Sequence, residues 1–133
     1  EAELETTLGP VGARVSYALQ GVRDPNTHQR PVNSPKHLGR IGASLPLLRD
    51  RLRLSSEARF MSARHTLAGP DAPAFGVVNL TVVGRPLRNG LELSGSLDNV
   101  LNHHYGDPAG EELAQRLVIQ DGRVVRIAAR YQF

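Results

Sequence analysis

Residues 123–133 read Arg-Val-Val-Arg-Ile-Ala-Ala-Arg-Tyr-Gln-Phe, and this stretch decides the fold. Apolar and polar side chains alternate along it. A period of two puts an apolar row on one face of a β-strand and a charged row on the other. The sequence ends within this strand, so we expect the strand to close a β-barrel, in which the last strand pairs with the first and no edge stays free. The apolar row assigned to this closing strand is Val125, Ile127, Ala129, Tyr131 and Phe133.

The composition leaves little material for a water-excluding core. Aromatic residues make up 5% of the 133 residues, there is no Trp, and hydrophobic residues total 40%. The charged fraction of 22% is ordinary for a folded protein, so we do not expect disorder. No apolar run approaches the roughly 18 residues of a membrane-spanning helix, whereas barrel strands need to be apolar on one face only. The chain has no Cys, which excludes disulfides and thiolate chemistry.

The net charge of +3 comes from arginines, since Lys36 is the only lysine. A basic chain raises the question of nucleic-acid binding. Here the arginines are spread along the segments, and no aromatic stacking surface accompanies them. We therefore expect them to face solvent or a polar lumen, and we predict no nucleic-acid partner.

The same alternation recurs in about seven segments of roughly ten residues, close to the length at which a tilted strand crosses a bilayer. Short and long connections follow each other in strict turn. The segments are residues 1–8, 14–20, 40–45, 52–60, 75–86, 91–105 and 123–133. The short connections are residues 9–12, 48–51 and 88–90, the last an Asn-Gly hairpin turn, and the long ones are residues 24–37, 65–74 and 106–121.

This organisation predicts an all-β fold, an antiparallel up-and-down transmembrane β-barrel of which residues 1–133 form the C-terminal part. Tight turns on the periplasmic side and long loops outside are typical of such barrels. An odd number of strands leaves the first and last strands pointing the same way, so they cannot pair antiparallel. Since Glu1 falls inside an alternating segment and no export signal is visible, we expect further barrel strands upstream.

The C-terminal row resembles the signature of bacterial outer-membrane barrels, whose closing strand ends in Phe. Residues 91–108 are more specific and resemble the late-strand motif of TonB-dependent receptors. In that family a strand ends in a run such as Asn-Leu-Phe-Asp-Lys-Tyr-Tyr, often with Asp-Pro soon after. Asn99, Val100 and Tyr105 occupy matching positions, whereas Leu101 replaces the usual aromatic residue and Asn102 the acid. Residues 32–37, 60–64 and 75–80 are also similar to the C-terminal third of the family.

The resemblance implies a barrel of about 22 strands whose lumen holds an N-terminal plug. Members of the family take up ferric siderophores, cobalamin or similar scarce nutrients across the outer membrane, with energy passed through TonB. The implied partners are outer-membrane lipid, the missing plug and barrel strands, the TonB complex and the barrel-assembly machinery. The implied location is the bacterial outer membrane.

Candidate ligand contacts lie in the predicted external loops, at His28, His65 and Asp107. The pair His103 and His104 would point to opposite faces of a strand and could not chelate one ion. No Gly-x-Ser-x-Gly elbow, HExxH, P-loop or CxxC motif occurs. We therefore predict no catalytic residues, no metal site and no cofactor, and a protein that is not an enzyme.

Charged residues of the segments are expected on the lumen side. Glu3 and Glu5 share a face with Arg14 and Arg40, which favours ion pairs over acid–base chemistry. The other charged residues assigned to the lumen are Glu57, Arg59, Glu92, Asp98, Arg126 and Arg130. Aromatic residues assigned to the membrane interfaces are Phe60, Phe75, Tyr105 and Tyr131. Residues 111–118 could form a short helical turn.

Two other classes of protein also fit this sequence pattern. An independent small outer-membrane barrel with a structural or adhesive function requires an eighth strand. A soluble all-β ligand-binding module requires that the apolar rows converge on a sealed core.

Overall fold

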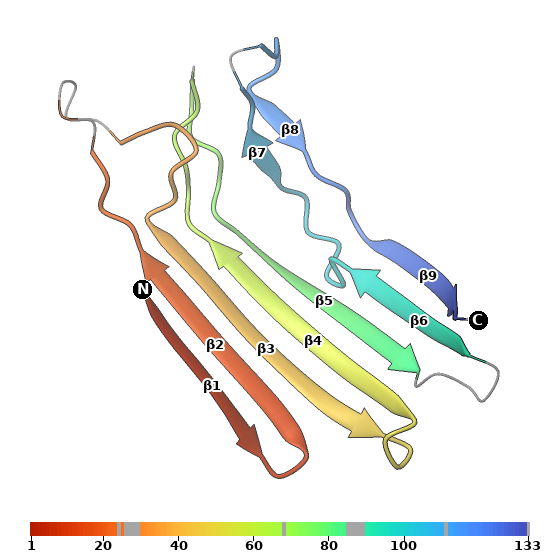
Figure 1. The fold of residues 1–133 in the computed structure, drawn as a ribbon. Helices are drawn as coiled ribbons and strands as arrows, with labels where there is room; N and C mark the ends of the chain where they lie inside the picture. The colour runs from red at the N-terminus through yellow and green to blue at the C-terminus, as the bar shows by residue number, and fades with distance from the viewer. Residues whose placement is uncertain (24, 26–29, 68, 85–89, 111, 133) are drawn as a thin grey trace.

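Figure 1 shows a computed structural model of the chain, which describes residues 1–23, 25, 30–67, 69–84, 90–110 and 112–132. All regular elements in this part of the chain are β-strands, and none of its residues belongs to a helix that could span a membrane. The strands are β1 (Ala2–Leu8), β2 (Val11–Leu19), β3 (His37–Leu47), β4 (Leu52–Met61), β5 (Phe75–Gly84), β6 (Leu91–Asp98), β7 (Gly106–Pro108), β8 (Leu117–Ile119) and β9 (Val124–Tyr131).

Seven strands form one antiparallel sheet in the order β1-β2-β3-β4-β5-β6-β9. Each strand pairs with its neighbour along the chain, except that the β7–β8 hairpin lies between β6 and β9 in sequence. The predicted all-β, antiparallel, up-and-down arrangement is confirmed. The sheet is open, because β1 and β9 lie at opposite edges, and the two strands run in the same direction (Figure 1).

The register divides the sheet into two faces of opposite character. Residues directly opposite in neighbouring strands share a face, as in the row of Leu4, Val15, Ile41, Ala58 and Val78. One face consists of the even-numbered residues of β1, β4 and β5 and the odd-numbered residues of β2, β3, β6 and β9. We call it the apolar face, because none of these residues is Asp, Glu, Lys or Arg. Its large exposed side chains include Leu4, Leu8, Val15, Tyr17, Leu19, Ile41, Phe60, Val82, Leu93, Val125, Ile127 and Tyr131.

The opposite face, called the polar face, carries every charged side chain of the seven strands. The alternation predicted for the segments is confirmed, and the charged residues predicted to share one face do share it. The charged residues of the polar face are Glu3, Glu5, Arg14, Arg40, Arg53, Glu57, Arg59, Glu92, Asp98, Arg126 and Arg130.

Long and short connections lie at opposite ends of the sheet (Figure 1). At the turn end, Leu8 pairs with Val11 across a two-residue turn, in which Gly9 has a φ of 61°. A glycine with positive φ followed by Pro10 suits a type II′ hairpin turn. Of the predicted Asn-Gly turn, Arg88 and Asn89 lie outside the described residues.

Two predictions about the third long connection are wrong. The strand that begins at Leu91 ends at Asp98 and does not continue to Tyr105, because Asn99 and Asn102 adopt φ angles of 50° and 52° and turn the chain. Residues 117–119 form β8, not the end of a helical turn, because they pair with β7. The hairpin of β7 and β8 therefore extends the loop end of the molecule (Figure 1).

The described part of the chain has almost no buried interior. The buried apolar side chains are Ala72, Phe75, Val77 and Ala109, and no large side chain is below 2% exposure. Phe75, Ala72 and Ala109 lie at the loop end, not beneath the middle of the sheet. Hydrogen bonds between strands hold the sheet, and none of the described segments forms a second layer over its apolar face.

Candidate functional site

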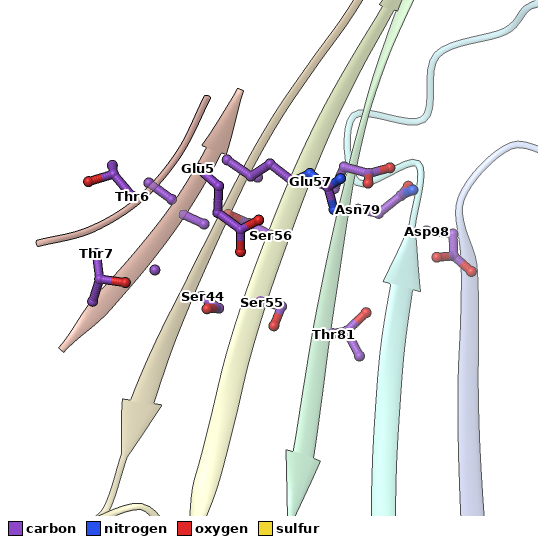
Figure 2. Close-up of a pocket in the computed structure, with 15 residues that line it drawn as sticks. Glu5, Thr6, Thr7, Ser44, Ser55, Ser56, Glu57, Asn79, Thr81 and Asp98 are labelled. Atoms are coloured by element: carbon purple, nitrogen blue, oxygen red, sulfur yellow. The ribbon is translucent and has the colours of Figure 1, made fainter. Parts of the chain in front are cut away.

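The polar face is hollowed along the middle of the sheet. A hollow of about 460 Å³ is lined by residues of six neighbouring strands, from Glu5 on β1 to Asp98 on β6 (Figure 2). A single hollow can touch six strands only if the sheet curves toward it, so the polar face is the concave one. Between Glu5 and Asp98, the lining of this hollow includes Arg14, Glu57 and Asn79.

A second hollow of about 430 Å³ continues the first toward the loop end. The two share Arg14, Gly42 and Glu57, and the second adds Arg40 and Arg59. We call the two together the trough. Gly42 lies between Arg14 and Glu57 in the register, so its missing side chain leaves space between these two long residues.

The trough carries charges of both signs. Arg14 forms an ion pair with Glu3, as predicted for this face, and Asp98 forms one with Arg126. Serine and threonine hydroxyls and the Asn79 amide fill the positions between the charges. Such a lining binds water and polar partners, and no His lines either hollow. No nucleophile–base pair of the kind used in acyl transfer is therefore formed among the described lining residues.

A compact cluster joins the long connections at the loop end. Arg64, which is 3% exposed, donates hydrogen bonds to Asn33 Oδ1 at 3.1 Å, to Asp107 Oδ1 at 2.7 Å and to the Gly106 carbonyl at 3.1 Å. Its guanidinium carbon lies 5.4 Å from the centre of the Phe75 ring, within the range of a cation–π contact. We call this group, together with Tyr105, the loop cluster.

The aromatic pair of the loop cluster corrects a prediction. Phe75 lies on the polar side of β5, is 4% exposed, and stacks on Tyr105 with ring centres 4.1 Å apart. Neither ring therefore belongs to an interface belt on the apolar face. The contact with Arg64 and the stacking on Tyr105 explain why these rings pack inward. Phe60 and Tyr131 do lie exposed on the apolar face.

Asn99 organises the turn that follows β6. Its side-chain Oδ1 accepts a hydrogen bond from the His103 amide at 2.9 Å, and its Nδ2 donates to the His103 carbonyl at 2.8 Å and the Asp121 carbonyl at 3.3 Å. Its own amide donates to Asn79 Oδ1 at 2.9 Å. The buried residue Asn99 thus connects both ends of the third long connection to β5. Its positive φ also suits Asn, which tolerates left-handed backbone better than most residues.

Replacing Asn99 by Asp is expected to lower the free energy of unfolding by about 2 kcal/mol, because a carboxylate cannot donate to the two carbonyl oxygens now bound to Nδ2. Urea unfolding followed by circular dichroism in detergent micelles measures this change. Leu101→Ala serves as a control in the same turn, since Leu101 is exposed. Equal stability of Asn99→Asp and the wild type would contradict this role.

The predicted ligand contacts are only partly described. His65 is exposed, and its Nδ1 lies 2.7 Å from Asp71 Oδ1. Asp107 is 38% exposed and has one carboxylate oxygen on Arg64. His28 lies outside the described residues. The structure therefore brings Asp107 into the loop cluster, whereas His65 pairs within its own connection.

The structure also describes most of the other residues singled out from the sequence. His103 and His104 are exposed in the turn after β6. In the C-terminal row, Ile127 is 84% exposed and Val125, Ala129 and Tyr131 are exposed with it, whereas Phe133 lies outside the described residues. Among the residues that the structure describes, no three His, Asp or Glu side chains are placed to hold a metal ion together.

The sequence reasoning missed Arg64 and Asn33. Both belong to connections without alternation, so no period assigns them to a face. The available signal was that both residues lie in stretches, 32–37 and 60–64, that resemble the receptor family.

No protein-family model matches the chain, and no curated protein matches it significantly. Function is therefore inferred from the two faces of the sheet, the trough and the loop cluster.

Proposed function

We propose that this chain is the C-terminal barrel wall of a TonB-dependent outer-membrane receptor that takes up ferric siderophores, cobalamin or a similar scarce nutrient. One observation carries the membrane part of the proposal. Across seven strands, the apolar face holds no Asp, Glu, Lys or Arg, although large apolar side chains on it are exposed.

Lipid is the medium that suits such a face. A soluble protein rarely exposes a contiguous apolar surface of this extent. A charged side chain at the lipid-facing midplane of a barrel costs about 2–4 kcal/mol for Arg or Lys, so selection removes it from that face only. Alternation then leaves the charges on the other face, as it does here.

The polar trough supports a lumen that contacts a second part of the receptor. Ion pairs and hydroxyls on a concave, wet surface match the polar interior of outer-membrane barrels. In the proposed receptor a plug from elsewhere in the protein faces the trough. The remaining strands of the barrel pair with the open edges at β1 and β9.

The loop cluster supports an extracellular role for the long connections. Arg64, Asn33 and Asp107 belong to three different connections, and their hydrogen bonds fix these segments relative to one another. Held loops position ligand contacts better than independent ones. In this proposal the loop end faces outward, the turn end faces the periplasm, and energy reaches the receptor through the TonB complex.

The alternatives fit the sheet less well. A small independent barrel needs an eighth strand to close, because β1 and β9 run in the same direction at opposite edges of the seven-stranded sheet. A soluble binding module must cover its apolar rows, but no described part of the chain does so. Neither alternative explains the apolar face and the open edges together.

Uptake by cells that carry the gene tests the proposal. Deleting the gene is expected to abolish accumulation of at least one radiolabelled nutrient among ferric siderophores and cobalamin. In the wild type, collapse of the inner-membrane proton gradient should stop the same accumulation, because transport in this class is energised from that membrane. Cell fractionation by density gradient should place the protein in the outer membrane.

Two outcomes would count against the proposal. Recovery of the protein among soluble proteins removes the membrane assignment. Outer-membrane location with unchanged accumulation of every nutrient tested removes the uptake assignment and favours a structural barrel. A complemented strain carrying Arg49→Gln is a suitable control, because Arg49 is exposed in the short turn between β3 and β4, at the opposite end of the sheet from the long connections.

A further inference from the structure

We infer that the loop-end half of the trough binds the transported ligand through an anionic group, and that Arg40 and Arg59 together hold this group. The inference rests on the proposed uptake function and names the charge class of the ligand. It begins from the hollow of about 430 Å³, which is within the size range of small-molecule sites. β3 begins and β4 ends at the loop end (Figure 1), so both arginines lie within three residues of the end that faces outward in the proposed receptor.

The two arginines lie directly opposite each other. Arg40 and Arg59 are partners in the register of β3 and β4, and both line the hollow. Like charges in this arrangement destabilise a pair of strands, because the two side chains share a face at close range. An anion between the two guanidinium groups offsets this repulsion. Each group can donate two parallel hydrogen bonds to one carboxylate or phosphate.

Arg59 is held in place without being neutralised. Its guanidinium carbon lies 5.8 Å from the centre of the Phe75 ring, within the range of a cation–π contact. Phe75 is itself 4% exposed and stacked on Tyr105, so the ring is a fixed support. Arg59 Nε is buried and has no hydrogen-bond partner in the described part of the chain. A guanidinium that is fixed, partly desolvated and unpaired attracts an anion more strongly than one in free solution.

The carboxylates that line the same hollow do not neutralise the two arginines. Glu3 is committed to Arg14 through an ion pair and a hydrogen bond. Glu1 precedes β1 at the edge of the sheet, two strands from the nearer arginine, or about 10 Å at the usual strand spacing. Glu57 lies two residues from the other arginine on β4, but neither arginine forms an ion pair with any described residue. The pair therefore still lacks an opposite charge.

A ligand with a net negative charge complements this pair. Among the nutrients of the proposed function, these ligands are ferric complexes with carboxylate or catecholate chelators, whereas ferric trihydroxamates and cobalamin are neutral. A neutral ligand would leave both arginines unpaired. Ser16, opposite Arg40 in the register, supplies a hydroxyl beside the site. Ala18 and Leu38 form an uncharged border toward the loop end.

Uptake kinetics of the whole receptor in cells test the inference. Ferric citrate and ferric enterobactin are the anionic ligands, and ferrichrome and cyanocobalamin are the neutral ones, each radiolabelled. We expect accumulation of an anionic complex that depends on the gene. In Arg40→Gln and in Arg59→Gln, the half-saturating concentration of this complex should rise about tenfold, the loss of one charge-assisted hydrogen bond, with the maximal rate unchanged.

Two further variants serve as controls. Arg53→Gln removes an exposed arginine from the polar face of the same strand, β4, outside both hollows, and should leave the half-saturating concentration unchanged. Arg40→Lys keeps the charge and should lie closer to the wild type than Arg40→Gln. The amount of heat-modifiable protein in the outer membrane shows whether each variant is folded.

The possible results separate this inference from the proposed function. Gene-dependent accumulation of neutral ligands alone overturns the inference and leaves the proposed receptor standing. An unchanged half-saturating concentration of the anionic complex in both glutamine variants does the same. A lower maximal rate for every ligand, at unchanged half-saturation, also overturns it, because the arginines then serve the segment that fills the lumen. Absence of gene-dependent accumulation of any ligand would overturn the proposed uptake function, and this inference with it.

Discussion

Replacing Asp107 by Ala is expected to destabilise the loop end by about 3–5 kcal/mol, more than removal of its partner Arg64. The Arg64 guanidinium is 3% exposed, so loss of the carboxylate strands a buried charge that water cannot reach. In Arg64→Met an apolar side chain takes the place of the guanidinium beside Phe75, and the Asp107 side chain, which is 38% exposed, can be solvated. This second variant is expected to cost about 2 kcal/mol for its lost hydrogen bonds.

Hydrogen exchange at the backbone amides of β7 and β8 measures both effects, since opening of the loop cluster exposes this hairpin first. Asp71→Ala is the control, because the Asp71 carboxylate pairs with the exposed His65. A larger loss of protection in Arg64→Met than in Asp107→Ala would show that the charge of Arg64 is not buried when the protein is in its native setting.

Placing Arg on the two faces of β9 is expected to destabilise the protein to very different extents. Ala129 belongs to the apolar face and Ala128 to the polar face, one residue apart on the same strand. In a bilayer, Ala129→Arg should reduce the free energy of unfolding by about 2–4 kcal/mol, the cost of a cation on the lipid-facing side of a barrel. Ala128→Arg should cost less than about 1 kcal/mol, because Ala128 lies on the polar face opposite the uncharged Ser94.

Urea titration of the whole proposed receptor, reconstituted in vesicles, gives the two values, with circular dichroism as the measure of β-structure. The same variants compared in detergent micelles, which deform around a charge, should differ less. If Ala128→Arg proves the more costly of the two, the polar face and not the apolar face is covered by lipid.

Alternation determined the parts of the fold that the sequence could predict. Side chains of a strand point to opposite sides in turn, so residues 124–131 and the other segments reveal their faces without knowledge of their neighbours. The antiparallel order followed from the short connections, since a turn such as Gly9-Pro10 leaves no other partner within reach. These features are local, and local features can be read from the chain.

The turn after β6 marks the limit of this reasoning. The sequence predicts one long strand over residues 91–105, yet the chain bends at Asn99. Its positive φ is sustained by hydrogen bonds to His103 and Asp121, one of them 22 residues away. The prediction of the strand end failed, because the stabilising partner lies in a distant part of the sequence.

The sequence by itself determined that this protein is a meander of half-apolar strands with its charges on one face. Only the tertiary structure decided what the long connections do: it placed Arg64 against Asn33 and Asp107, which are 31 and 43 residues away in the chain. The physical reason is that strand alternation is a property of consecutive peptide units. The ion pair of Arg64 and Asp107 instead depends on which connections lie side by side in the folded chain. No period in the sequence predicts that arrangement.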